Sequence, residues 1–117
     1  MIKVVHKDTL APLVSIEAES LDGADLAGMS LEHGLLWGKS MQRASLKRAN
    51  LERANLDRAD LRRADLTHAR LVQASLCSAD LRGARLTGVD LRGARYDRGT
   101  RWPWFFNPAL RGAVLVA

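Results

Sequence analysis

The sequence predicts an all-β fold in which the chain turns after every five residues and closes into a coil after every four such segments. A large apolar residue recurs at every fifth position from Leu21 to Tyr96, and almost all of these residues are leucine. Alanine stands two positions before each of them without interruption from Ala44 through Ala84. Self-similarity at a short, fixed period is typical of a repeat architecture.

An uninterrupted α-helix is excluded by this period, although Ala, Leu, Arg and Glu all favour helix. Five residues advance an α-helix by about 500°, so each leucine would lie about 140° around the helix from the previous one. The apolar residues would then surround the helix and leave no stripe to bury. An uninterrupted strand is excluded as well, because an odd period places successive leucines on opposite faces.

A chain that turns after each repeat is compatible with the pattern. Within a repeat, alanine and leucine lie at strand spacing and point to the same side, which becomes the interior. Four leucines meet in each coil and the alanines leave room for them, as expected of a narrow β-tube. The residue before the leucine is Asp, Asn or Ser in most repeats. Such side chains bond nearby backbone groups and favour turns, whereas the mostly charged or glycine residues after the leucine are expected to face water.

The tandem motif A(D/N)LXX resembles the repeat of the pentapeptide-repeat family and covers residues 21–96. The resemblance implies a right-handed quadrilateral parallel β-helix, a solenoid of about four coils. The match is weaker in the first coil, where Met29, Gly34 and Lys39 replace alanine and the segment GLLWGK interrupts the polar positions. A bulge or loop is therefore expected within residues 29–41.

The chain is expected to form a single domain, residues 1–117, with a cap at each end of the repeat. The open ends of a β-helix expose core leucines and unpaired backbone, and terminal units of repeat proteins are atypical for this reason. Residues 1–20 are expected to form a strand-like N-terminal cap, because IKVV and LVSIEA show strand patterns. Residues 97–117 are expected to form the C-terminal cap.

The C-terminal tail resembles a cap of the same family with the form T-x-W-P-x-G-F-D-P. The matching residues are Thr100, Trp102, Pro103, Phe106 and Pro108, and the departures are Trp104, Phe105 and Asn107. Two interpretations of the aromatic residues remain open at this point. They plug the last coil, or they form the surface of an end-to-end homodimer. The residues concerned are Trp102, Trp104, Phe105 and Phe106.

Stacking every twentieth residue places basic side chains on two adjacent walls of the coil. Coils lie about 4.8 Å apart, so this patch is about 10–15 Å long and can span about two or three phosphates. The candidate anion-binding or nucleic-acid-binding wall consists of Arg43, Lys47, Arg48, Arg62, Arg63 and Arg82. The alternative interpretation is a solvated face that keeps the protein soluble. No aromatic residues interleave with these arginines, which disfavours a reader of single-stranded nucleic acid.

No catalytic, cofactor or metal site is expected. Asp60 and Asp80 stack on one wall, but their position before the leucine marks them as turn-bonding residues. His6, His33 and His68 fall on different segments and walls, without a carboxylate or thiolate cluster at ligand spacing. The chain is therefore not expected to be an enzyme.

The composition favours a cytoplasmic protein. No run approaches the roughly 18 apolar residues of a membrane span, and charged residues interrupt the N-terminus where a signal peptide needs a long apolar stretch. Cys77 is the only cysteine and is expected to be a free surface thiol. The net charge of +5 permits attraction to nucleic acid or anionic surfaces without requiring it.

Three functions remain as hypotheses. The first is a non-enzymatic scaffold or protein-interaction module that binds an unknown macromolecule through its outer walls. The second is the binding of phosphate or nucleic acid through the basic wall. The third comes from the family resemblance alone, since some members bind DNA gyrase by imitating the shape and charge of DNA. Such mimics are strongly acidic, so the basic charge of this chain disfavours the third hypothesis.

Overall fold

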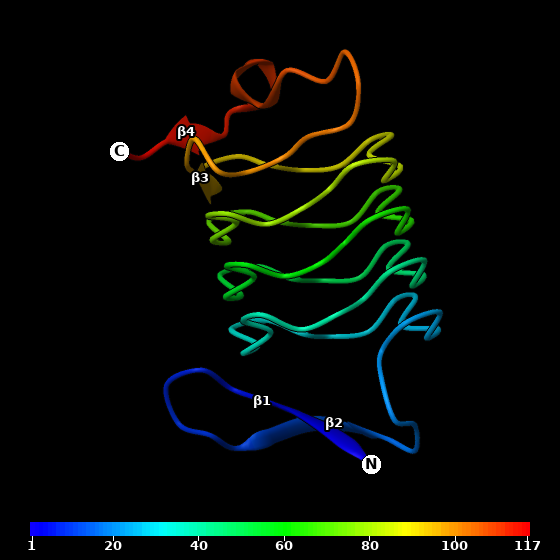
Figure 1. Cartoon of the computed structure of the whole chain (residues 1–117). Helices are drawn as coiled ribbons and strands as arrows, with labels where there is room; N and C mark the ends of the chain where they lie inside the picture. Colours follow the sequence, from blue (N-terminus) through cyan, green and yellow to red (C-terminus); the bar gives the residue numbers. More distant parts are fainter.

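The computed structural model describes all 117 residues, most of which wind into stacked coils of twenty residues (Figure 1). Parallel β-bridges join residues that lie twenty positions apart, from Asp25 and Ser45 in the first coils to Ser75 and Arg95 in the last. Each bridge is held by backbone hydrogen bonds between neighbouring coils. The structure therefore contains the twenty-residue spacing between paired segments that the sequence predicts.

Each repeat ends in a turn that the backbone closes with a hydrogen bond. The Ala54 N–H donates to the Leu51 carbonyl at 3.0 Å, and the same bond recurs along the stack. The third residue of each turn has a left-handed backbone, with φ of 58° at Arg53 and 70° at Gly93. Glycine adopts this conformation freely, which explains why glycine alternates with longer residues at this position.

The polar residue before each leucine stabilises the turn, as the repeat pattern predicts. The Asp60 carboxylate accepts the Arg62 N–H at 3.2 Å, and the Asn55 side-chain oxygen accepts the Asp57 N–H at 3.0 Å. These bonds satisfy backbone donors that have no partner within the turn, and they hold the polar side chain outside the coil. The alternation of inward and outward residues follows from this geometry.

The core is a continuous column of leucine and alanine inside the coils. Every core leucine from Leu26 to Leu81 is fully buried, and the alanines from Ala44 to Ala79 are at most 1% exposed. No polar or charged residue is buried. The interior therefore consists of the large and small apolar residues that the repeat pattern predicts.

The first coil is regular, so the expected bulge or loop within residues 29–41 is wrong. Leu36 and Met41 are fully buried, and Leu35 is joined to Asn55 by the same parallel bridge as in later coils. The departures from alanine have a different cause, because this coil borders the N-terminal cap and not another coil. A Cβ atom added at Gly34 would lie 2.8 Å from the Leu31 carbonyl oxygen, so glycine is needed for local space there.

The N-terminal cap is an antiparallel hairpin of β1 (Ile2–Val5) and β2 (Pro12–Ile16) that lies across the open end of the first coil (Figure 1). Val4 is fully buried against the core. The Val5 carbonyl accepts the Leu35 N–H at 2.8 Å, which joins the hairpin to the coil. Both strands expected in this segment are present.

The C-terminal cap begins with a one-residue extension of the last coil. Asp80 pairs with Arg101, twenty-one residues away, so one residue is added in the turn that follows β3 (Arg95–Tyr96). A loop then leads to the 3₁₀ helix η1 (Pro108–Arg111) and to β4 (Val114–Leu115), which pairs in parallel with β3. None of the helical segments has the length and apolar character needed to cross a membrane.

Candidate functional site

Four of the six basic residues expected to bind anions line one shallow cavity of about 390 Å³. We call this group the arginine wall; its members are Arg43, Arg62, Arg63 and Arg82. They come from three successive coils because they occupy the two outward positions after Met41, Leu61 and Leu81. Gln42 and Gly83 complete a lining without hydrophobic residues.

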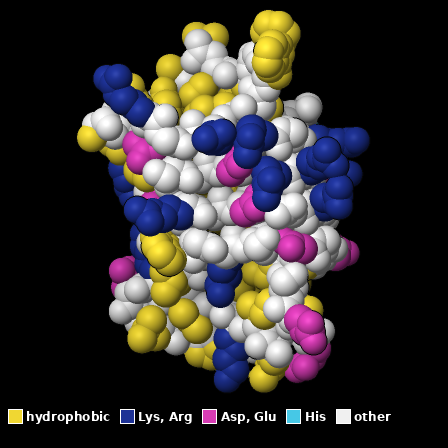
Figure 2. All heavy atoms as spheres, in the orientation of Figure 1, with side chains coloured by type: hydrophobic (Ala, Val, Ile, Leu, Met, Phe, Trp, Pro, Cys, Tyr) yellow, Lys and Arg dark blue, Asp and Glu magenta, His cyan; other side chains and the backbone are white.

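Two of these arginines are paired with carboxylates. The Arg62 Nε and Nη2 atoms donate to both oxygens of Asp60 at 2.9 and 2.8 Å. Arg82 binds Asp80 in the same way, with its shortest contact at 2.6 Å. The side-chain hydrogen bond from the neighbouring arginine holds the pKa of each aspartate below its ordinary value. Both carboxylates therefore stay ionised at neutral pH and neutralise their arginines. Figure 2 shows such mixing of basic and acidic side chains on the face that it draws.

Arg43 and Arg63 have no carboxylate within ion-pair distance, so they supply the uncompensated charge of the wall. Gly83 leaves space for one of them, since a Cβ atom at this glycine would lie 3.1 Å from the Arg63 Cγ atom. The stem of Arg63 is thereby supported by the coil above it. Two guanidinium groups remain available for hydrogen bonds to a ligand.

The other two predicted basic residues, Lys47 and Arg48, do not line this cavity. They lie on the neighbouring side of the coil, where Asp65 is close to Lys47. Burial raises the pKa of Asp65, but hydrogen bonds from Thr67 and the charge of Lys47 lower it overall. The structure thus divides the predicted wall into a group of four arginines and a separate pair.

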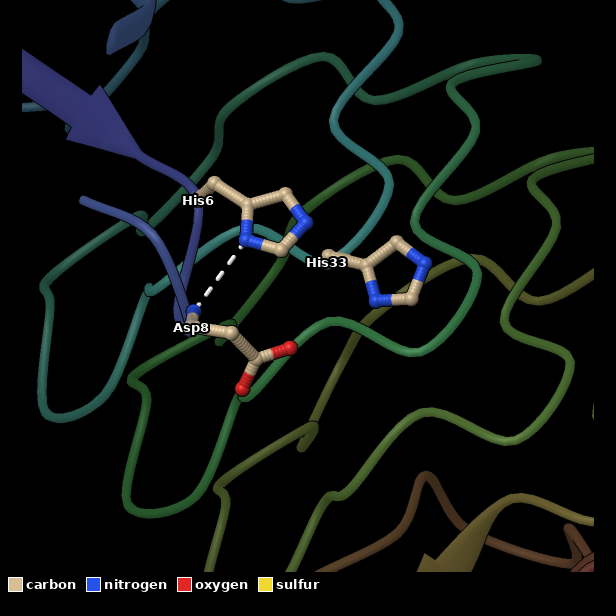
Figure 3. A group of neighbouring side chains, drawn as sticks. All are labelled: His6, Asp8 and His33. Atoms are coloured by element: carbon tan, nitrogen blue, oxygen red, sulfur yellow. Dashed lines mark hydrogen bonds between the residues drawn. The ribbon is translucent and has the colours of Figure 1, made fainter. Parts of the chain in front are cut away.

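The structure brings His6, Asp8 and His33 together from two different segments, so the expectation that no carboxylate lies at ligand spacing from these histidines is wrong (Figure 3). The two imidazole rings stack with centroids 4.9 Å apart and planes at 18°. His6 Nδ1 accepts the N–H groups of Asp8 and Thr9 at 3.1 and 3.3 Å. The pairing follows from docking of β1 beside Gly34, which the sequence pattern does not reveal.

This group fits a metal ion poorly, although its ligand atoms lie within 4.8 Å of one another. A metal must lie in the plane of each imidazole that binds it, and two nearly parallel stacked rings do not direct their lone pairs to one point. The Nδ1 lone pair of His6 is also occupied by backbone donors. The rings join the hairpin to the first coil.

The aromatic residues of the C-terminal cap divide into two pairs. Trp102 and Phe106 pack against the core and stack with ring centroids 5.3 Å apart. Trp104 and Phe105 project into solvent and are 86% and 96% exposed. Only Trp102 and Phe106 therefore lie where a plug of the last coil must lie.

Neither the stacked aspartates nor the cysteine has the properties of a catalytic group. Asp60 and Asp80 are held by arginines at the hydrogen-bond distances given above. Burial raises the pKa of the Cys77 thiol, and its side-chain hydrogen-bond partner is Ser75, which cannot act as a base toward it.

Known proteins with the same five-residue repeat resemble this chain in sequence and structure. A family model described as pentapeptide repeats matches residues 20–63 and 59–95. Rfr23, a pentapeptide repeat protein from the cyanobacterium Cyanothece 51142, is 36% identical with a TM-score of 0.66. This match covers 67% of the chain and 53% of Rfr23, so the chain spans about half the length of that protein.

A second solved structure shares the fold. It is a trypsin-treated form of QnrB1, a plasmid-mediated fluoroquinolone resistance protein, which is 22% identical with a TM-score of 0.53. The match covers 83% of the chain and 53% of QnrB1. A search of the curated proteins gave no significant match.

Proposed function

Because the chain belongs to the pentapeptide-repeat family, we propose that it is a non-enzymatic interaction module that binds an acidic protein surface through the arginine wall. The observation that carries this proposal is the cavity lined by Arg43, Arg62, Arg63 and Arg82, in which two guanidinium groups lack a carboxylate partner. Guanidinium groups recognise carboxylates through paired hydrogen bonds.

The proposal includes the closed, right-handed, four-sided β-helix that the family resemblance implies. Parallel bridges at intervals of twenty residues and turns after every fifth residue support four sides. A tube of this kind holds its side chains in fixed columns, so the arginines of successive coils need little reorganisation to meet a partner.

We propose no catalytic activity because the pKa shifts of Asp60, Asp80 and Cys77 disfavour catalysis. A general acid or base works best when its pKa lies near the working pH. The pKa of Asp60 and of Asp80 is lowered, away from neutrality. The thiolate is the reactive form of cysteine, and the raised pKa of Cys77 disfavours it.

An acidic protein is favoured over nucleic acid because the free charge of the wall is small. Each phosphate that a protein neutralises adds to its affinity for nucleic acid, and Arg62 and Arg82 are already neutralised by aspartates. The lining also contains no aromatic side chain on which bases can stack. Nucleic-acid binding is therefore the alternative that the experiment must test.

The experiment measures binding of fluorescent poly-glutamate and of a short DNA duplex at low salt. We expect poly-glutamate to bind the wild-type protein more tightly than the duplex does, with an affinity that falls as salt is added. Arg43→Glu/Arg63→Glu should abolish this binding without changing the melting temperature. Arg53→Glu/Arg98→Glu is the matched control, because Arg53 has the same left-handed backbone as Arg43 but lies outside the cavity.

Two results would overturn the proposal. The first is equal binding by the two double variants, which would show that only overall charge matters. The second is tighter binding of the duplex than of poly-glutamate, which would establish the nucleic-acid alternative.

A second candidate property is a homodimer through the C-terminal cap. The exposed rings of Trp104 and Phe105 favour it, since apolar surface of this kind is more stable when it is covered. A two-fold pairing of the caps would cover both rings and close without forming fibres.

Binding of a topoisomerase by imitation of DNA, the third hypothesis from the sequence, is disfavoured. Imitation of DNA at a topoisomerase requires negatively charged walls, whereas this chain has a net charge of +5.

A further inference from the structure

A second groove, of about 340 Å³, lies where the N-terminal cap meets the first two coils. It shares no residue with the arginine wall, and its lining is Lys3, Val5, Leu35, Trp37, Lys39 and Asn55. Lys3 and Val5 belong to β1, and the remaining residues belong to the repeat. Docking of the hairpin therefore creates the groove.

The apolar residues of the groove are not required by the repeat. Leu35 stands directly before the core residue Leu36, at the position that is Asp, Asn or Ser in most repeats. Trp37 follows Leu36 at an outward position and is 52% exposed. The core is complete with Leu36 alone, which is fully buried. Leu35 is half-buried beside the hairpin and Trp37 is half exposed, so together they form an apolar surface outside the coil that the core of the repeat does not require.

The edge of this apolar surface is positively charged. Lys3 and Lys39 line the groove, and the Arg58 guanidinium lies 5.9 Å from the centre of the Trp37 ring. No acidic residue is in the lining. The carboxylate of Asp57, the residue next to Arg58, accepts the Cys77 N–H at 2.9 Å in the following coil and forms no ion pair with Arg58.

We propose that this groove binds a linear acidic segment of a partner protein that carries an aromatic or large aliphatic side chain. The apolar side chain packs against Leu35 and Trp37, and flanking carboxylates pair with Lys3, Lys39 and Arg58. A peptide suits the groove better than a small molecule, because small-molecule sites bury most of the ligand and half of Trp37 faces solvent here. This inference does not rest on the proposed function of the arginine wall.

The test is a titration of the ¹⁵N-labelled protein with the capped peptide Asp-Asp-Phe-Leu-Asp-Asp, followed by nuclear magnetic resonance. We expect a saturable displacement of the Trp37 indole N–H signal and of the Leu35 and Lys39 amide signals. Trp37→Ala should weaken binding at least about tenfold, as for a central aromatic contact. Trp104→Ala removes a tryptophan that is also exposed but lies at the opposite end, and it should leave the affinity unchanged.

Two further peptides separate the apolar and the charged contributions on the unmodified protein. Asp-Asp-Ala-Ala-Asp-Asp should bind several-fold more weakly. Lys-Lys-Phe-Leu-Lys-Lys should not change the chemical shift of the Trp37 indole N–H. The inference is overturned if the acidic peptide leaves the Trp37 signal in place, or if the lysine peptide displaces it equally. Chemical-shift changes confined to the amides of Arg43 and Arg63 would also overturn this inference, while leaving the proposed function of the arginine wall intact.

Discussion

At the turns, arginine repeatedly occupies a backbone conformation that glycine adopts more easily. The φ angles of Arg43, Arg48, Arg58 and Arg63 lie between 59° and 61°, in the left-handed region. This conformation costs an ordinary residue about 1–2 kcal/mol. The chain therefore keeps charge on its outer walls at some cost in stability.

Replacing one of these arginines with glycine should stabilise the protein. Glycine removes the left-handed penalty but adds entropy to the unfolded chain, so Arg48→Gly should raise the free energy of unfolding by about 0.5–1 kcal/mol. Lys47→Gly is the control, because the neighbouring residue has no left-handed φ and should lose stability instead. Denaturant melts measure both changes. If Arg48→Gly is less stable than the wild-type protein, relief of the left-handed backbone does not outweigh the added entropy of the unfolded chain.

The arginine–aspartate pairs make stability depend on pH in the acidic range. Side-chain hydrogen bonds from Arg62, Arg82 and Arg92 lower the pKa of Asp60, Asp80 and Asp90 below the ordinary 3.8. A lowered pKa in the folded state means that these groups contribute stability above the ordinary pKa and lose it as the pH falls through the folded value. The contribution is small because the pairs are exposed.

We therefore expect the free energy of unfolding to stay constant from neutral pH to about pH 5 and to fall below about pH 4. Asp60→Asn/Asp80→Asn should flatten this decline, because amides do not titrate in this range. Urea melts across the acidic range measure the effect. An unchanged slope in the double variant would assign the acid sensitivity to other carboxylates.

At the scale of the element, the junction between the N-terminal hairpin and the first coil depends on one glycine. Gly34 lies where His6 pairs with the coil, and a Cβ atom there would meet the Leu31 carbonyl oxygen at 2.8 Å. This oxygen belongs to the backbone and cannot move aside without disturbing the turn. The position is therefore more restricted than the alanine positions of later coils.

Gly34→Ala should destabilise the protein by about 1–3 kcal/mol, as expected of overpacking. The loss should be concentrated at the hairpin, so the amides of Lys7 and Leu35, which bond across the junction, should exchange faster with solvent. Amides in the central coils serve as the internal control. Hydrogen exchange that rises uniformly through the stack would contradict a local role for Gly34.

The repeat can be predicted because it depends on local spacing, whereas the junctions cannot. The inward leucines and the turn-bonding aspartates follow from the period alone, and the structure confirms both. The stacked pair of His6 and His33 depends on how the hairpin docks, which is a tertiary contact without a sequence signal. The replacement of alanine in the first coil predicts an irregular backbone. Parallel β-bridges to the second coil and buried core residues nevertheless keep this coil regular.

The candidate site is predictable only in part for the same reason. Residues twenty positions apart in the sequence lie in one column, so their positions alone predict that four arginines lie together. Pairing of Arg62 and Arg82 with aspartates depends on rotamers that counting does not give. The groove at Trp37 depends on the cap, so the sequence shows only that GLLWGK is unusual.

At the scale of the whole molecule, the two ends of the stack are unlike. The N-terminal end is covered by a hairpin, whereas the C-terminal end is covered by a loop and η1 (Figure 1). Trp104 and Phe105 of this loop lie in solvent. Burial of these rings contributes about 25 cal/mol per Å² of apolar surface. Association also removes translational and rotational freedom, and the free-energy cost of this loss is comparable to the gain from burying the rings.

We expect a weak-to-moderate homodimer through the C-terminal cap. Sedimentation of the wild-type protein at increasing concentration should show a shift from monomer to dimer, and Trp104→Glu/Phe105→Gly should remain monomeric. Trp37→Glu changes an exposed tryptophan at the other end and should still dimerise. A wild-type protein that stays monomeric at high micromolar concentration would contradict the dimer.

Each coil is bonded only to the neighbouring coils of the stack. The length of the stack can therefore change independently of the relative orientation of its two caps. Removal of twenty residues shortens every column by one member and leaves the two caps facing as before. On the proposed four-sided coil, removal of five residues keeps leucine in the interior but turns the C-terminal cap by a quarter revolution about the long axis. Trp104 and Phe105 would then stand above a different wall. Small duplications and losses within such a gene can thus reposition an exposed surface without altering the core that supports it.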